Sequence, residues 1–232
     1  MSLPAIRASL RRLKRRGEIA DPYRGFHVIV PPEYRRLGCL PPEQFVQDLA
    51  AHLGEPAYAA LLSAAEIHGA AHQRPQRFQV MMRTNRRPLR CGSVEVEFVA
   101  RADLERTPTA EVNTPRGRLR VASPEATALE LVGYADRCAG LDNVVTVLRE
   151  LAERVDANRL VAAAALAPIA WSQRLGYLLE VLGLEVLANA LEGHVRANAR
   201  SVAPLVRSKP TSGARRIPRW KLAVNAEVEP DA

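Results

Sequence analysis

The sequence has few cysteines, few lysines and no long apolar run. Its three cysteines, Cys39, Cys91 and Cys138, are far apart and odd in number. They therefore fit neither a disulfide framework nor a zinc site, and they indicate a reducing compartment. No run of about 18 apolar residues exists, which excludes a transmembrane helix. Because no apolar segment follows the basic N-terminus, a secretory signal is also excluded. We expect a cytoplasmic protein without a membrane partner.

The overall composition is that of a folded protein. The chain has 232 residues, of which 47% are hydrophobic and 25% charged. This length allows one large domain or two small ones with a sizeable core, and it excludes wholesale disorder and collagen-like repeats. Only three of the 33 basic residues are lysines. The predominance of arginine indicates a GC-rich coding bias, typical of a bacterial protein.

Positive charge is concentrated at the front of the chain. Residues 1–37 contain nine basic and three acidic residues, so +6 of the net charge of +8 lies in the first sixth of the sequence. A localised basic surface favours a polyanionic partner.

The first 30 residues predict a helix followed by a hairpin. Ile6, Leu10 and Leu13 recur at helical spacing, which predicts a helix over 3–16, and residues 18–30 predict a β-hairpin with an arginine in its turn. This order is typical of the second half of a winged helix, whose recognition helix enters the major groove and whose wing follows the DNA backbone. The candidate DNA contacts are Arg7, Arg11, Arg12, Lys14, Arg15 and Arg24.

A winged helix also needs helices that bury the other side of the recognition helix. A lone helix and an isolated hairpin are marginal in water. We therefore expect the N-terminus to be truncated, with packing of this segment on the following domain as the alternative.

Two proline pairs, at 31–32 and 41–42, predict a linker over 33–42. The expected organisation is a partial winged helix over 1–32, this linker, and a larger mixed α/β domain rich in helices over 43–232, so the fold class is α+β. Helices are expected over 43–53, 57–70, 124–135, 142–154, 156–166 and 171–190. Strands are expected over 78–82, 93–99, 118–121 and 220–225, with a mobile loop over 207–219.

The common enzyme motifs are absent from the sequence. There is no Walker A loop, no dinucleotide-binding glycine motif and no nucleophile elbow. Glu95, Glu97 and Asp103 could act as nuclease carboxylates. However, the strict alternation over 93–99 predicts an exposed polar strand face without any chemistry. We expect no enzyme activity, no catalytic residue and no cofactor.

Two further polar pairs stand out in the second part of the chain. His68 and His72 have the i, i+4 spacing of metal ligands, but no third ligand accompanies them, so no metal site is predicted. Gln173 and Arg174 lie at the start of an expected helix, where the arginine could bridge segments through a carboxylate.

Six segments, in order along nearly the whole chain, carry a family resemblance. They are residues 10–17 with 25–32, LLSAAEIHGAAHQ at 61–73, SPEATAL at 123–129, QRLGYLL at 173–179 and WKLAVN at 220–225. These motifs resemble the AbiEi family of antitoxins and transcriptional regulators, which belong to type IV toxin–antitoxin and abortive-infection systems. The chain departs from the family in lacking the first half of the winged helix, which bears on operator binding more than on antitoxin action.

The resemblance implies an antitoxin that represses its own operon. Its winged helix would bind double-stranded operator DNA, and its C-terminal domain would counteract a nucleotidyltransferase-like toxin without a stable complex. The candidate antitoxin or interaction residues within the motifs are His68, His72, Gln73, Gln173 and Arg174. Two alternatives stay open: a stand-alone winged-helix transcription regulator without a toxin partner, and a nucleic-acid enzyme.

Overall fold

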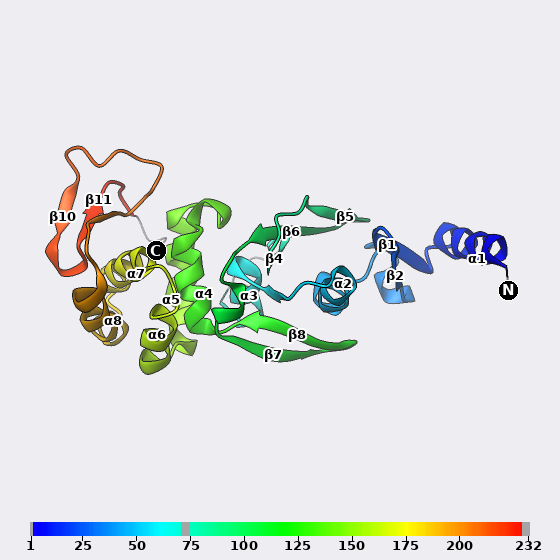
Figure 1. Ribbon diagram of the computed structural model, residues 1–232, viewed down its shortest axis with the longest axis horizontal. Coiled ribbons are helices and arrows are strands. Elements are labelled where there is room, and N and C mark those ends of the chain that lie inside the picture. Colours follow the sequence, from blue (N-terminus) through cyan, green and yellow to red (C-terminus); the bar gives the residue numbers. More distant parts are fainter. Residues whose placement is uncertain (1, 71–74, 229–232) are drawn as a thin grey trace. The chain divides into compact units, whose positions relative to one another are not determined.

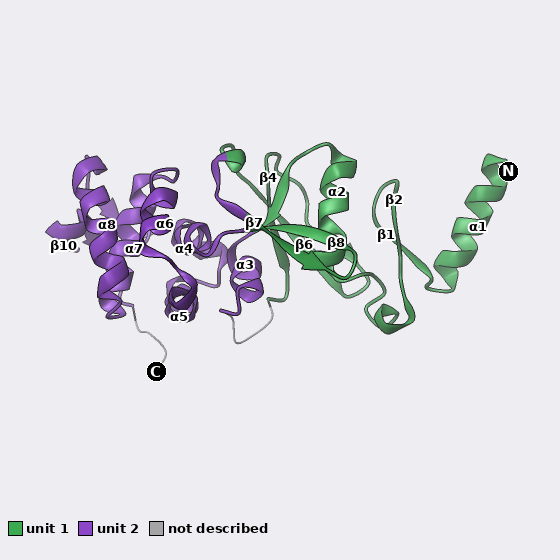
Figure 2. Ribbon diagram, turned by 90° about the horizontal axis from the view of Figure 1, so that it is seen from below, with its two compact units in different colours: residues 1–59, 75–105, 110–121 green, residues 60–74, 106–109, 122–232 purple. Residues whose placement is uncertain are grey.

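The computed structural model describes residues 2–70 and 75–228, which form two compact units (Figure 2). Unit 1 comprises residues 1–59, 75–105 and 110–121, and unit 2 comprises residues 60–74, 106–109 and 122–232. This division differs from the predicted one at 1–32, 33–42 and 43–232, which concerns functional segments and stays a prediction. Residues 39–42 of the predicted linker are buried, so they pack as part of unit 1.

The front of unit 1 is a helix followed by a two-stranded hairpin, as predicted (Figure 1). Helix α1 spans Leu3–Arg15, and the antiparallel strands β1 and β2 span Ile19–Tyr23 and Phe26–Ile29. No residue of α1 is buried, and its apolar stripe of Ile6, Leu10 and Leu13 is only half-buried. The hairpin, by contrast, buries Val28 and contacts β5 of the larger sheet. The helix therefore depends on the hairpin for its attachment to unit 1.

A six-stranded mixed sheet forms the body of unit 1. Its order is β5-β6-β4-β3-β8-β7. The strands are β3 (Ala57–Ala59), β4 (Phe78–Met82), β5 (Leu89–Cys91), β6 (Val94–Ala100), β7 (Thr109–Thr114) and β8 (Gly117–Ala122). Every residue of β3 and β4 is buried, and helix α2 (Val46–Leu53) contacts β3. The strands predicted over 78–82, 93–99 and 118–121 are thereby confirmed.

The prediction of one helix over 57–70 was wrong at its start. Ala57–Ala59 form β3, which pairs with β4 on one side and β8 on the other, and α3 begins only at Leu61. The helical propensity of alanine is a weak preference, and ladder hydrogen bonds in the middle of a sheet override it.

Unit 2 is built mainly of helices. They are α3 (Leu61–Ile67), α4 (Pro124–Gly133), α5 (Leu141–Leu151), α6 (Ala157–Ala164), α7 (Ile169–Val181) and α8 (Glu185–Asn198). Helix α4 begins as predicted, because the Ser123 hydroxyl oxygen accepts a hydrogen bond of 3.2 Å from the Ala126 backbone N–H. The single helix predicted over 171–190 was wrong: Gly183, with a φ of +71°, separates α7 from α8.

Two glycines allow tryptophans to pack directly against the helices of unit 2. A Cβ on Gly133 of α4 would lie 2.3 Å from the Trp171 ring, and one on Gly176 of α7 would lie 2.1 Å from the Trp220 ring. Trp220 is completely buried. This packing fixes the C-terminal segment against α7.

The C-terminal segment forms a three-stranded sheet in the order β10-β11-β9. Its strands are β9 (Ala203–Pro204), β10 (Arg215–Ile217) and β11 (Leu222–Val224). The predicted loop over 207–219 was therefore wrong for β10, whereas the strand predicted over 220–225 is confirmed at its centre. These elements confirm the α+β class. Within the described ranges, none of the helices combines the length and apolar character that crossing a membrane requires.

Candidate functional site

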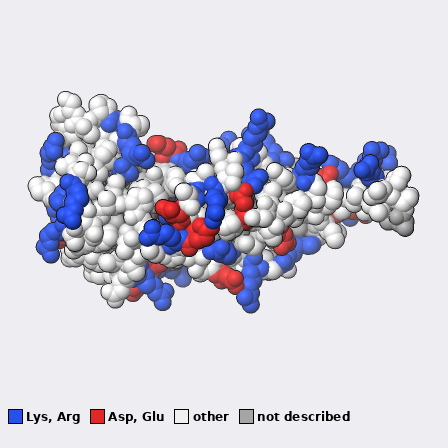
Figure 3. Space-filling model, in the orientation of Figure 1, with Lys and Arg blue, Asp and Glu red and all other residues white. Residues whose placement is uncertain are grey.

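Four predicted DNA contacts lie on α1 as an exposed set of cations. Arg7, Arg11, Arg12 and Arg15 are all exposed, and none of their side chains has an ion-pair or hydrogen-bond partner among the described residues. Figure 3 shows basic side chains on α1, and others spread over the rest of the same face. Four guanidinium groups without ion-pair partners on one helix are suited to binding phosphate oxygens, because each can donate two parallel N–H hydrogen bonds.

Lys14, the fifth predicted contact of α1, is held by the hairpin. Its Nζ lies 2.6 Å from Oδ2 of Asp21, and Nδ1 of His27 lies 2.6 Å from Oδ1 of the same carboxylate. The hydrogen bond to Asp21 raises the pKa of Lys14. Partial burial would by itself raise the pKa of Asp21, but the bonds from Lys14 and His27 outweigh it, so this pKa is lowered. Lys14 therefore joins the helix to the hairpin.

Arg24, the predicted wing contact, lies in the turn between β1 and β2 and is exposed. Gly25 follows it with a φ of +76°, a conformation that a tight hairpin turn requires and that glycine adopts without strain. The sequence signal for a hairpin with a basic turn is therefore confirmed as local structure. Whether Arg24 contacts DNA stays a prediction.

Two of the three carboxylates that could have formed a nuclease site, Glu95 and Glu97, are bound by neighbouring side chains. Oε2 and Oε1 of Glu95 lie 3.2 Å and 3.0 Å from Nε of Arg77 and of Arg90. Glu97 accepts a hydrogen bond of 3.2 Å from Nε2 of Gln79. No group of three or more His, Cys, Asp or Glu side chains that could hold a metal occurs in the part of the chain that the structure describes.

The histidine pair of the LLSAAEIHGAAHQ motif is described only in part. His68 follows α3, and its Nε2 lies 2.7 Å from the carbonyl oxygen of Ala122. This contact ties the end of α3 to the end of β8, within unit 2, and gives His68 a positioning role there. His72 and Gln73 lie outside the described residues.

Gln173 acts inside unit 2, where its side chain is 2% exposed. Its Nε2 donates to three backbone carbonyls, those of Ser201, Trp220 and Lys221, at 3.0, 3.1 and 2.7 Å. The side chain thereby fastens α7 to the residues that precede β9 and to those that precede β11. This placement suits a structural role more than direct contact with a partner.

Arg174 is buried like its neighbour, but it lines a hollow of about 280 Å³. Its Nε donates to the carbonyl of Pro204 at 2.9 Å. Burial, and then the charge of Arg207, lower the pKa of Arg174, whereas the charge of Asp136 opposes them. The same hollow is also lined by Lys209 and by acidic residues, so it offers charges of both signs to a ligand or partner.

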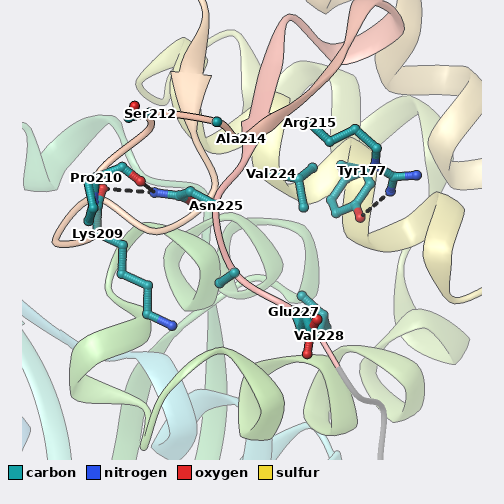
Figure 4. A pocket seen from close by; sticks show the side chains of 12 residues that line it. Tyr177, Lys209, Pro210, Ser212, Ala214, Arg215, Val224, Asn225, Glu227 and Val228 are labelled. Atoms are coloured by element: carbon teal, nitrogen blue, oxygen red, sulfur yellow. Dashed lines mark hydrogen bonds between the residues drawn. The ribbon is translucent and has the colours of Figure 1, made fainter.

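A second hollow of about 910 Å³ lies beside the C-terminal sheet and shares Lys209 with the first (Figure 4). Nδ2 of Asn225 donates to the carbonyls of Val206 and Lys209 at 2.8 and 2.9 Å, which shapes the loop on one side. On the other side Arg215 donates to the Tyr177 hydroxyl at 3.4 Å. Sequence reasoning missed these residues because the expected loop over 207–219 carried no signal for folding back on α7.

A family model and a crystal structure each resemble the chain over more than half of its length. The family model of the AbiEi antitoxin C-terminal domain matches residues 58–181, just over half of the chain. The crystal structure of the RV2827C protein from Mycobacterium tuberculosis is similar with a TM-score of 0.60 and 19% identity, over 93% of this chain and 78% of that chain. At this identity the likeness shows the fold alone.

A more distant likeness is to the solution structure of the antibiotic-resistance factor ANT(2″)-Ia. Its TM-score is 0.33 and its identity 13%, over 66% of this chain and 94% of that chain. A score this low carries no argument. Comparison with curated proteins finds no match.

Proposed function

The chain belongs to the AbiEi antitoxin family, and on this premise we propose that it is the antitoxin of a type IV toxin–antitoxin system and also the repressor of its own operon. Its toxin is a nucleotidyltransferase-like protein, and its second partner is double-stranded operator DNA. Both activities belong in the cytoplasm, and neither requires an enzyme active site or a cofactor.

The observation that carries the DNA-binding half is the set of four exposed arginines on α1. Each lacks a partner among the described residues, so each is available to a phosphate without first breaking an ion pair. Neutralising DNA phosphates releases counterions, which supplies most of the non-specific affinity. Helix α1 is proposed to enter the major groove, with Arg24 of the hairpin turn following the backbone.

The antitoxin half is proposed to reside in the family domain and the helices of unit 2. The match to the antitoxin C-terminal domain ends with α7, the helix that carries Gln173 and Arg174. Gln173 positions the C-terminal segment, and Arg174 lines the hollow beneath it. We assign antitoxin action to this region, by a mode that does not need a stable complex with the toxin.

A growth assay combined with a repression assay tests the proposal. The gene next to this one is expressed alone, with the full chain, and with a variant in which Arg7, Arg11, Arg12 and Arg15 are all alanine. We expect the neighbour to arrest growth and both versions to restore it. Only the unchanged chain should repress a reporter that carries the upstream region of the operon.

Each other outcome identifies which half fails. Repression without rescue would make the chain a stand-alone transcription regulator. If the unchanged chain restores growth but does not repress the reporter, the antitoxin assignment stands and the operator-binding assignment is contradicted. A harmless neighbour, or no rescue by the unchanged chain, contradicts the antitoxin assignment.

A further inference from the structure

Two of the three cysteines, which are 52 positions apart in the sequence, lie together in unit 1. Cys39 follows the hairpin and is fully buried, whereas Cys91 ends β5 and is half-exposed. The two thiols interact, since each shifts the pKa of the other. A buried thiol and a half-exposed one in direct contact have the arrangement that reversible oxidation needs, because an oxidant reaches one sulfur and the other is already in place.

The backbone around the pair is in close antiparallel contact. The Ser93 N–H donates to the Leu37 carbonyl at 2.8 Å. One step inward, a Cβ on Gly92 would lie 2.0 Å from that carbonyl oxygen and 2.8 Å from Cα of Gly38. Continued by one residue, this register places Cys91 opposite Cys39. Opposite residues of an antiparallel pair have Cα atoms about 4.5–5.5 Å apart, within the range that a disulfide spans.

The surroundings of Cys91 favour its thiolate. The hydrogen bond from the Cys39 thiol lowers the pKa of Cys91 to about 7, with help from the Asp21 backbone N–H and the charge of Lys14, although partial burial and the negative charge of Asp21 oppose this. As the donor of the bond between the two thiols, and because it is buried, Cys39 has a raised pKa. The accessible sulfur is thus the nucleophile, and the buried sulfur keeps its proton.

We propose that Cys91 and Cys39 form a redox-active pair that peroxide converts reversibly into a disulfide. The Cys91 thiolate attacks one oxygen of hydrogen peroxide, the O–O bond breaks, and Cys91 becomes a sulfenic acid while hydroxide leaves. The Cys39 sulfur then attacks the Cys91 sulfur, and the S–O bond breaks. Its proton and the departing hydroxyl form water, so two thiols and one peroxide give one disulfide and two waters. A dithiol reductant reverses the change.

The assignment does not depend on what the chain binds, because it rests on the two sulfurs and the backbone that holds them. It also differs from what three scattered cysteines suggest in the sequence. The third cysteine, Cys138, is buried in unit 2, so it serves as an internal control for general oxidation.

The first experiment measures free thiols and disulfide-linked peptides in the full chain. The reduced protein is treated with hydrogen peroxide, quenched, and analysed by thiol titration and by peptide mass mapping without reduction. We expect two of the three thiols to be lost, one crosslinked species joining the peptides of Cys39 and Cys91, and full recovery with dithiothreitol. The variant Cys138→Ser should give the same crosslink.

A variant separates the two chemical steps. In Cys39→Ser the disulfide cannot close, so a sulfenic acid should accumulate on Cys91 and be trapped by dimedone, whereas the unchanged chain should give little of this adduct. The proposal is overturned if peroxide leaves both thiols intact, if it links either to Cys138 or to a second molecule instead, or if the Cys39→Ser variant gives no more dimedone adduct than the unchanged chain.

A second experiment needs no variant. Alkylation with iodoacetamide is followed for each cysteine by mass spectrometry over a range of pH. We expect Cys91 to react roughly tenfold faster than the other two cysteines at neutral pH, because a far larger fraction of it is thiolate. The three rates should become similar in urea-unfolded protein. A folded-state rate for Cys91 no greater than that of Cys138 would contradict its assignment as the nucleophile.

Discussion

Replacing the four free arginines of α1 with alanine should weaken DNA binding in a salt-dependent way. The four are Arg7, Arg11, Arg12 and Arg15, none of which has a partner among the described residues. No residue of α1 is buried, and alanine favours helices. The free energy of unfolding of the variant should therefore lie within about 0.5 kcal/mol of that of the unchanged chain. Any loss of affinity then reports on the interface and not on the fold.

The size of the effect follows from the number of contacts. Each phosphate contact contributes roughly 0.9 to the slope of log K against log salt. If all four arginines contact phosphates, the slope should fall by roughly 3.6. Between about 50 and 200 mM salt, the unchanged chain should therefore lose roughly 150-fold more affinity than the variant. An arginine that reads a guanine edge instead should cost about 1–3 kcal/mol at all salt concentrations.

Fluorescence anisotropy with a labelled duplex from the upstream region measures both quantities. A matched control removes the same four charges elsewhere, through alanine at Arg154, Arg159, Arg196 and Arg200, which are exposed in unit 2. The control should keep the slope of the unchanged chain. An unchanged slope in the α1 variant would refute the assignment of α1 as the interface. An equal loss in the control would mean that net charge alone binds the DNA.

Three further predictions concern stability. Gly92→Ala should lower the free energy of unfolding in urea by at least about 2 kcal/mol, because the φ of Gly92 is +60° and a Cβ there would lie 2.0 Å from a carbonyl oxygen. The control Gly193→Ala, with open space around it, should be neutral or stabilising. Equal effects of the two substitutions would refute the close approach at Gly92. Gln173→Leu should cost about 1–3 kcal/mol by leaving buried carbonyls unpaired; a neutral result would contradict its positioning role. Because the pKa of Asp21 is lowered on folding, its stabilising effect is present above its unfolded value of 3.8 and lost as the pH falls through the folded value. Thermal unfolding of the unchanged chain and Asp21→Asn should thus differ near neutral pH and converge in acid; a difference that persists in acid would contradict this linkage.

Local patterns predicted the elements that local physics determines. The helix over 3–16, the hairpin after it and the strand over 78–82 follow from apolar spacing and turn residues, and each is present as Leu3–Arg15, Ile19–Ile29 and Phe78–Met82. The N-cap at Ser123 was equally visible, because a hydroxyl followed by proline and an acid is a local signal.

Features that depend on distant pairing were not predictable in this way. Ala57–Ala59 become a strand only because β4 and β8 lie on either side of them. The contact of Cys39 with Cys91 depends on the register of loop 37–39 against 91–93, which no spacing along the chain encodes. Likewise, Gln173 looked like a partner-binding residue because its burial depends on Ser201 and Trp220, which lie 28 and 47 positions further along the chain.

Asp21 of the hairpin takes part in three interactions. The Asp21 carboxylate holds Lys14 of α1 and His27 of β2, and its backbone N–H donates to the Cys91 sulfur. Oxidation of Cys91 would replace a thiolate acceptor by a neutral sulfur, which weakens that hydrogen bond. Since Asp21 also sets the contact between helix and hairpin, a change at the thiol pair acts on the same joint that the proposed DNA-binding surface uses. Protonation of Asp21 removes the charge that holds Lys14, whereas oxidation of Cys91 removes a thiolate charge that attracts Lys14 and repels the Asp21 carboxylate.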